Sequence, residues 1–167
     1  ETAHFINGFP TPDGRFHFAP DWAAVGREHQ AMPRLPDHMT VIEASDHEHP
    51  YRLVTAPSRN YLNSSFTETP TSIKRESRPT AKIHPHDLAA LGLADGDRVR
   101  VGNCRAHIVV HAESFDGLQR GVVVIESVWP NTAYEEGLGV NALVGADSAP
   151  PLGGAVFHDT AVWLRGA

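Results

Sequence analysis

The chain has 167 residues, and its 41% hydrophobic and 20% charged content is that of one ordinary globular domain with room for a short accessory segment. A formal net charge of −6 excludes the broad basic surface that draws nucleic acid, so we expect no nucleic-acid partner. A single cysteine, Cys104, excludes an internal disulfide and cysteine-clustered metal sites, and without a run of about 18 apolar residues we expect no membrane insertion.

The first 50 residues are irregular. The chain starts at Glu1 with neither Met nor a leader-like segment, so we expect a piece of a longer polypeptide. The stretch "HFINGFPTPDGRFHFAPDW" places a Pro-Asp-Gly turn between short aromatic runs and predicts a small hairpin or an extended strap. The following residues are rich in Pro, His and acids without a sustained period. We therefore assign residues 1–50 to a strap or linker.

Residues 51–167 carry a β pattern, and we assign them to one barrel domain. Strands are predicted at "YRLVT", "PTAKIH", "RVRVGN", "RAHIVVHAES", "RGVVVIES" and "AVWLR". A short helix is predicted to begin at Pro85 and to stop at Gly92, before an Asp-Gly-Asp turn. Six short strands with one or two small helices predict a mainly β fold, either a barrel or a sandwich.

Two polar loops are candidate binding elements. The first, Thr55 to Pro70, follows a predicted strand and offers many hydroxyl and amide groups with one guanidinium, Arg59. Such groups satisfy phosphate oxygens without a net charge. A surface loop built from Asx and Ser turns has the same composition, so the residues leave both interpretations open.

The second polar loop runs from Trp129 to Gly154. In it, Asn141 stands between apolar neighbours, where a side-chain amide can hydrogen-bond a purine or pterin edge. Trp129 can stack on a flat ring, although a Trp is more often part of a hydrophobic core than a platform for a ligand.

Histidine pairs raise the question of a metal site. The pairs are His47 with His49, His84 with His86, and His107 with His111. Residues four apart on a strand lie about 13 Å from each other, and no third ligand follows at a regular spacing, so we expect no metal site. No nucleophile elbow, Walker lysine or Gly-x-Gly-x-x-Gly is present. We expect no catalytic residue here and no turnover by this chain alone.

Four segments in order carry a family resemblance: "PTAKIHPHDLAALGLADGDRVRVGN", "GVVVIESVWPN", "VNALVGADSAP" and "HDTAVWLR". Together they resemble the molybdopterin-dinucleotide-binding domain, the C-terminal domain of molybdenum and tungsten enzymes of the dimethyl-sulfoxide-reductase superfamily. The residues that fall on the family pattern are Asp87, Leu91, Gly92, Leu93, Asp95, Gly96, Asp97 and Val99. The early stretch "FPTPDGRFHF" is similar to a strand that precedes this domain in those enzymes.

The resemblance implies a double-psi β-barrel of six strands with short capping helices, in which "HPHDLAALGL" is a structural cap. It also implies that the two polar loops hold the dinucleotide of a molybdopterin guanine dinucleotide cofactor, with molybdenum or tungsten, in the full-length parent but not in the isolated fragment. The implied cofactor-binding residues are Thr55, Pro57, Arg59, Asn60, Asn63, Ser64, Ser65, Trp129, Asn141 and Asp147. The implied partners are upstream domains of the parent and iron–sulfur or other electron-transfer subunits, in the cytoplasm or periplasm of a prokaryote.

The sequence departs from the family at two places in these loops. The usual Thr-Gly-Arg opening of the cofactor loop is Thr55-Ala56-Pro57 here, and Val144 replaces a Thr or Ser. Two other functions are compatible with a double-psi barrel. A stand-alone substrate-recognition module usually has a basic groove, which the net charge does not favour. A self-processing decarboxylase needs a Gly-Ser cleavage site or an active-site Ser or Lys pair, and we find neither.

Overall fold

The computed structural model describes residues 4–30, 32–35, 37, 40–126, 128–149 and 154–167. Two compact units are present, one made of residues 1–41 with 148–155 and the other of residues 42–147 with 156–167. Each is described by itself, and the division at residue 50 stays a prediction. No described helix is long and apolar enough to cross a membrane.

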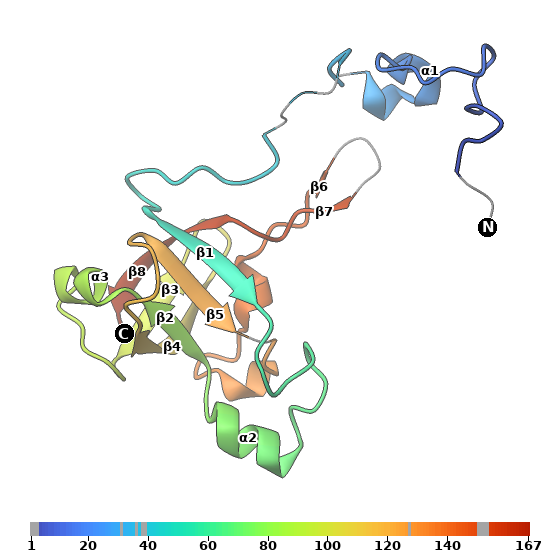
Figure 1. The fold of residues 1–167 in the computed structure, drawn as a ribbon. Helices are drawn as coiled ribbons and strands as arrows, with labels where there is room; N and C mark the ends of the chain where they lie inside the picture. Colours follow the sequence, from blue (N-terminus) through green and yellow to red (C-terminus); the bar gives the residue numbers. More distant parts are fainter. Residues whose placement is uncertain (1–3, 31, 36, 38–39, 127, 150–153) are drawn as a thin grey trace. The chain divides into compact units, whose positions relative to one another are not determined.

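The larger unit is a closed barrel of six strands in the order β1, β5, β2, β4, β3, β8 (Figure 1). The strands are β1 Tyr51–Ala56, β2 Thr80–Ile83, β3 Arg98–Gly102, β4 His107–Ser114, β5 Val122–Glu126 and β8 Thr160–Gly166. The pairs β1–β5 and β2–β4 are parallel, and the other four are antiparallel. Closure leaves no unpaired strand edge. This is the predicted double-psi β-barrel, and each predicted strand is present.

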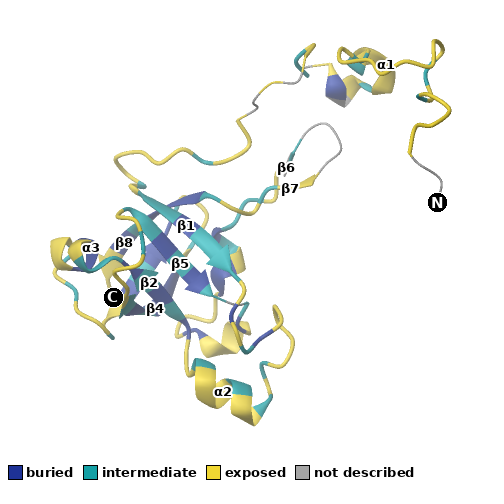
Figure 2. Cartoon of the chain, in the orientation of Figure 1, coloured by how far each residue is buried: buried dark blue, intermediate teal, exposed yellow. Residues whose placement is uncertain are grey.

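The barrel interior is filled by the apolar residues of the period-two pattern. In β3, Val99 and Val101 are fully buried, while Arg98 and Arg100 point the other way and pair with acidic residues. The same alternation buries Val123 and Ile125 in β5, and the buried positions concentrate in the barrel strands (Figure 2). Each such side chain contributes roughly 1.5–3 kcal/mol of burial, so the alternating pattern is what makes the barrel stable.

The strand pairing defines two ends of the barrel. At one end, called the loop end, β1, β5 and β3 finish and β2, β4 and β8 start. The connections 57–79, 103–106 and 127–159 therefore belong to the loop end. The connections 84–97 and 115–121 belong to the opposite end, called the helix end. Both polar loops thus leave from the same end of the barrel.

The predicted short helix lies at the helix end as α3 Pro85–Ala90. His84 caps its start by accepting a hydrogen bond from the His86 N–H at its Nδ1 atom, at 3.1 Å. Gly92, two residues beyond the helix, has φ +68, a left-handed conformation that glycine adopts without strain. The predicted start at Pro85 is confirmed, and the helix ends just before the predicted stop.

This helix ties together the two connections of the helix end. Leu88 enters the core, and the buried Asp87 accepts hydrogen bonds from the Gly121 N–H at 2.7 Å and from Arg120 Nε at 3.2 Å. These contacts are those expected of a structural cap.

A second helix of the barrel unit, α2 Pro70–Glu76, is not among the predicted elements. Its signals are Pro70 at the first helical position, directly after Thr69, and two basic residues in its last turn. The predicted start of the first polar loop is also wrong by two residues. Thr55 and Ala56 continue β1 and pair with Ile125 and Glu126, so the loop begins at Pro57.

The smaller unit contains little regular structure. Its elements are α1 Trp22–Val25, the 3-10 helix η1 Arg27–His29, and the two-residue strands β6 Ser148–Ala149 and β7 Gly154–Ala155, which pair with each other. The predicted turn is present, since the Phe9 N–H donates to the Gly14 carbonyl at 3.1 Å. Within the described part of 4–41, no strand flanks that turn.

Candidate functional site

The two polar loops meet at the loop end of the barrel. Because β1 and β5 are parallel neighbours with Ala56 opposite Glu126, the segments that follow them start side by side. The rings of Tyr61 and Trp129 then pack edge to face, with centroids 4.9 Å apart and planes at 84°. Both rings are buried in the hydrophobic core cluster. Residues 57–69 are called the first loop below, and residues 128–147 the second loop.

The first loop is held in a defined shape by its own backbone. Ser58, which is buried, accepts a hydrogen bond from the Tyr61 N–H at its Oγ atom, at 3.1 Å. Leu62 and Ser65 exchange backbone hydrogen bonds of 3.2 and 2.8 Å, which closes a two-residue turn. Asn63 lies in that turn with φ +52, a left-handed conformation that Asn tolerates better than most residues. The turn presents residues 63 and 64 to solvent.

Asn60 fastens this loop to α2. Glu76 Oε1 accepts hydrogen bonds from the backbone N–H and from Nδ2 of Asn60, at 2.9 and 2.7 Å. Arg75 Nη1 donates to Asn60 Oδ1 at 3.4 Å. Burial of the Tyr61 hydroxyl, with a smaller contribution from Glu76, raises the pKa of Tyr61. The hydrogen-bonding groups of the Asn60 side chain are therefore already used within the protein, where they orient the loop.

Three side-chain hydrogen-bond donors of the first loop have no partner among the described residues, and they are called uncommitted below. Arg59, Ser64 and Ser65 are exposed, and their side chains make no hydrogen bond or ion pair with any other described residue. A guanidinium and two hydroxyls on a closed turn form an anion-binding set, because a guanidinium matches phosphate oxygens in a planar fork and hydroxyls rotate to suit.

The second loop folds around Tyr134. The 3-10 helices η2 Asn131–Ala133 and η3 Val140–Leu143 flank this side chain. Tyr134 is buried, and this burial raises its pKa to about 12, with a partial offset from the Val140 N–H. A Cβ atom at Gly139 would lie 2.8 Å from Asn131 Oδ1 and 3.1 Å from Cε2 of the Tyr134 ring, so a larger residue there requires both side chains to shift. Asn141 in η3 and Asp147 are exposed.

The hairpin between β3 and β4 supports the second loop. Asn103 Nδ2 and Arg105 Nη1 both donate to the Leu143 carbonyl, at 2.7 and 3.3 Å. Glu43 pairs with Arg105 at 2.5 Å and also accepts a hydrogen bond from the Ala161 N–H at 2.8 Å. The hydrogen bond with Glu43 raises the pKa of Arg105, and Asp147 adds to this effect.

The sequence model of the family described as Molydopterin dinucleotide binding domain matches residues 51–161. The chain belongs to this family. Its cofactor is therefore of the molybdopterin type.

Longer proteins contain the same region. The chain is 31% identical over 161 residues to "Probable oxidoreductase YoaE" of Bacillus subtilis, a match that covers 96% of this chain and 23% of that protein. It is 28% identical over 174 residues to a putative catalytic subunit of dimethyl sulfoxide reductase from Halobacterium salinarum, covering 96% and 20%. The chain thus spans about a fifth of the length of these relatives.

The fold recurs in a solved structure. That of acetylene hydratase from Pelobacter acetylenicus matches with a TM-score of 0.75 at 15% identity, over 96% of this chain and 24% of that one. At this identity, the likeness concerns the fold.

The residues fit the dinucleotide of such a cofactor by their chemistry. The uncommitted donors of the first loop suit phosphate oxygens, and the exposed Asn141 amide suits the edge of a heterocycle. Trp129 is only 8% exposed and packs on Tyr61, so its role as a stacking platform stays a prediction. Among the described residues, no group of three or more His, Cys, Asp or Glu side chains is arranged to hold a metal ion.

Several residues near the two loops make contacts that the sequence did not predict. His107 Nε2 lies 3.1 Å from Glu136 of the second loop, whose pKa is lowered mainly by its hydrogen bond from Arg100. Glu136, Arg105 and Glu43 are absent from the predicted site residues. No local pattern marks them, because each is joined to its partner only by the folded barrel.

Proposed function

We propose that this chain is the C-terminal domain of a larger molybdenum or tungsten oxidoreductase, and that it holds the dinucleotide part of a molybdopterin guanine dinucleotide cofactor. Family membership supports the cofactor class, and the names of the longer relatives support the assignment of the parent as an oxidoreductase. Other domains of the parent would complete the cavity. Iron–sulfur or other electron-transfer subunits are proposed as further partners.

One observation carries the proposal: the uncommitted donors lie at the end of the barrel where both loops emerge. Arg59, Ser64 and Ser65 are exposed there without partners among the described residues, whereas Arg98, Arg100 and Arg105 are all engaged with glutamates. These donors can therefore bind a negatively charged ligand at the first loop.

Each predicted residue takes a role that its environment permits. Arg59, Ser64 and Ser65 would bind the pyrophosphate, and the Asn63 turn would present the backbone. Asn141 and Asp147 would bind the purine edge, because an amide and a carboxylate accept from guanine N–H groups. Thr55, Pro57, Asn60 and Trp129 would shape the walls. When bound, the metal centre supplies the redox chemistry, and this chain supplies binding and orientation.

The cofactor is tested on the complete gene product. The protein is purified and denatured, the released pterin is quantified by fluorescence after oxidation, and the nucleotide and metal are measured by chromatography and mass spectrometry. We expect pterin, guanine nucleotide and molybdenum or tungsten in fixed proportion. A product without pterin would contradict the function, and a different nucleotide would contradict the guanine form alone.

The site is tested on the 167-residue chain by chemical-shift mapping with GDP. We expect weak binding, with perturbed amides in residues 57–65 and 129–147. Residues 84–97 at the helix end are the internal control and should stay unchanged. Perturbations centred on His47, His49, His84 and His86, with both loops silent, would contradict the proposed site.

A further inference from the structure

Residues 4–37 of the smaller unit carry a large apolar surface that their own fold does not bury. No hydrophobic side chain among the described residues of 4–41 is buried. Phe18 is 69% exposed, Ile6 69% and Leu35 58%. Burial of apolar surface is worth roughly 25 cal/mol per Å², and a segment this small cannot build a core of its own. Contiguous exposed apolar surface marks an interaction site.

Part of this surface is an ordered row of aromatic rings. Phe5 stacks on Phe9 with centroids 4.6 Å apart, Phe9 contacts Phe16 at 5.3 Å, and Phe16 contacts Phe18 edge to face at 4.8 Å. Such contacts contribute beyond the area that they bury. The row therefore keeps its rings in place while their outer faces stay open, and it is called the Phe row below.

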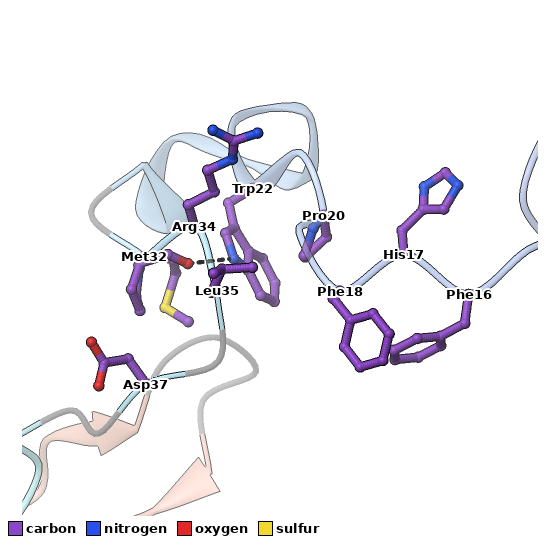
Figure 3. A pocket seen from close by; sticks show the side chains of 10 residues that line it. Phe16, His17, Phe18, Pro20, Trp22, Met32, Arg34, Leu35 and Asp37 are labelled. Carbon is purple, nitrogen blue, oxygen red and sulfur yellow. Dashed lines mark hydrogen bonds between the residues drawn. The ribbon is translucent and has the colours of Figure 1, made fainter.

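The Phe row borders an apolar groove of about 380 Å³ (Figure 3). Its apolar walls come from Phe16, Phe18, Pro20, Trp22, Met32 and Leu35. The Trp22 indole N–H donates to the Pro33 carbonyl at 3.1 Å, which fixes the ring as one wall. Charged groups occupy its margin, where Arg34 and Asp37 are labelled in Figure 3. An apolar floor with a charged margin is typical of a protein-binding groove.

This surface lies in a segment that a longer relative shares. The match to the Bacillus subtilis relative covers 96% of this chain, so it extends through most of residues 1–41, which lie outside the cofactor-binding match at 51–161. The segment is thus shared with a protein of which this chain is only 23%. We infer that the Phe row and its groove pack against an apolar surface of the same longer polypeptide that lies outside these 167 residues. This inference rests on the proposed function in one respect, that the chain is part of a larger enzyme.

The test compares the complete gene product with the 167-residue chain by amide hydrogen exchange. We expect residues 16–35 to exchange at least tenfold more slowly in the complete protein. The variant Phe16→Ser with Phe18→Ser should return exchange in this segment to the rate of the 167-residue chain. Val25→Ser, at an exposed position outside the groove, is the matched control and should leave the slow exchange intact.

Two outcomes would overturn the inference. One is equal exchange of residues 16–35 in both proteins. The other is protection in the 167-residue chain that grows with its concentration and is lost in the double variant, because a second copy would then be the occupant. Cofactor content is measured on the same sample. A complete protein that holds the cofactor with an open groove contradicts the inference alone, and a protected groove without cofactor contradicts the proposed function alone.

Discussion

Replacing Gly102, at the end of β3, by a larger residue should destabilise the protein as long as Trp163 is present. The two residues face each other across the β3–β8 pair, and the indole folds over the glycine. A Cβ atom at position 102 would lie against Cζ2 and 2.7 Å from Cε2 and Cη2 of the ring, where ordinary carbon contacts are about 3.5–4.0 Å. The φ of Gly102 is outside the left-handed region, so alanine meets no backbone strain, and the ring is the obstacle.

The size of the effect follows from these contacts. Gly102→Ala must displace Trp163, which also carries the Arg165 guanidinium 4.4 Å from its ring. Overpacking of this kind costs about 1–3 kcal/mol, while the alanine itself gains roughly 0.5–1 kcal/mol in a strand. We therefore expect the free energy of unfolding to fall, by up to about 2.5 kcal/mol. In a Trp163→Ala background the same change should raise it by about 0.5–1 kcal/mol.

The assay is urea unfolding of the 167-residue chain and its three variants, followed by circular dichroism, with the four m-values compared. The double-mutant cycle isolates the contact between residues 102 and 163. If Gly102→Ala is just as destabilising without the indole, the close approach of the ring is not the reason for the glycine.

Three further predictions concern the two ends of the barrel. Burial raises the Tyr134 pKa from 10.0 to about 12, so the unfolded chain loses this proton first, and the free energy of unfolding should fall by about 2 kcal/mol as the pH rises from 10 to 12. Tyr134→Phe should remove that fall in alkaline urea titrations, and an unchanged slope would assign it to another group. Asp87→Ala removes the acceptor of the Gly121 N–H and should lower the free energy of unfolding by about 1.5–3 kcal/mol. Asp87→Asn keeps an acceptor, so its free energy of unfolding should fall less. Equal losses of stability in thermal melts would show that this hydrogen bond does not contribute. In the complete gene product, Arg59→Ala should weaken cofactor retention at least tenfold, because a hydrogen bond to a charged phosphate is worth roughly 1.5–3 kcal/mol. Retention is measured as pterin content after gel filtration, and Lys74→Ala on α2 is the control. An equal loss of pterin in both variants would point to a general charge effect.

Local features of the barrel can be predicted from the amino-acid order because they depend on neighbours in the chain. Val99 and Val101 alternate with arginines, which predicts a strand with one buried face wherever that strand is placed. Pro85 and Gly92 bound the helix α3 because the ring of one and the missing side chain of the other act on their own backbone. The helix α2 escapes prediction because its segment is also rich in loop-forming residues, and its Pro70 fits a loop equally well.

The joining of the two polar loops depends on the tertiary structure. The parallel pairing of β1 with β5 places Ala56 beside Glu126, although no local periodicity relates these distant segments. The availability of a side chain depends on the fold in the same way. Arg59 and Asn60 are neighbours in a polar loop, yet Asn60 is bound to Glu76 and Arg59 is left open to solvent. The residue types of each loop follow from the amino-acid order alone, whereas the barrel sets which of them meet, because hydrogen-bond partners are chosen by proximity in space.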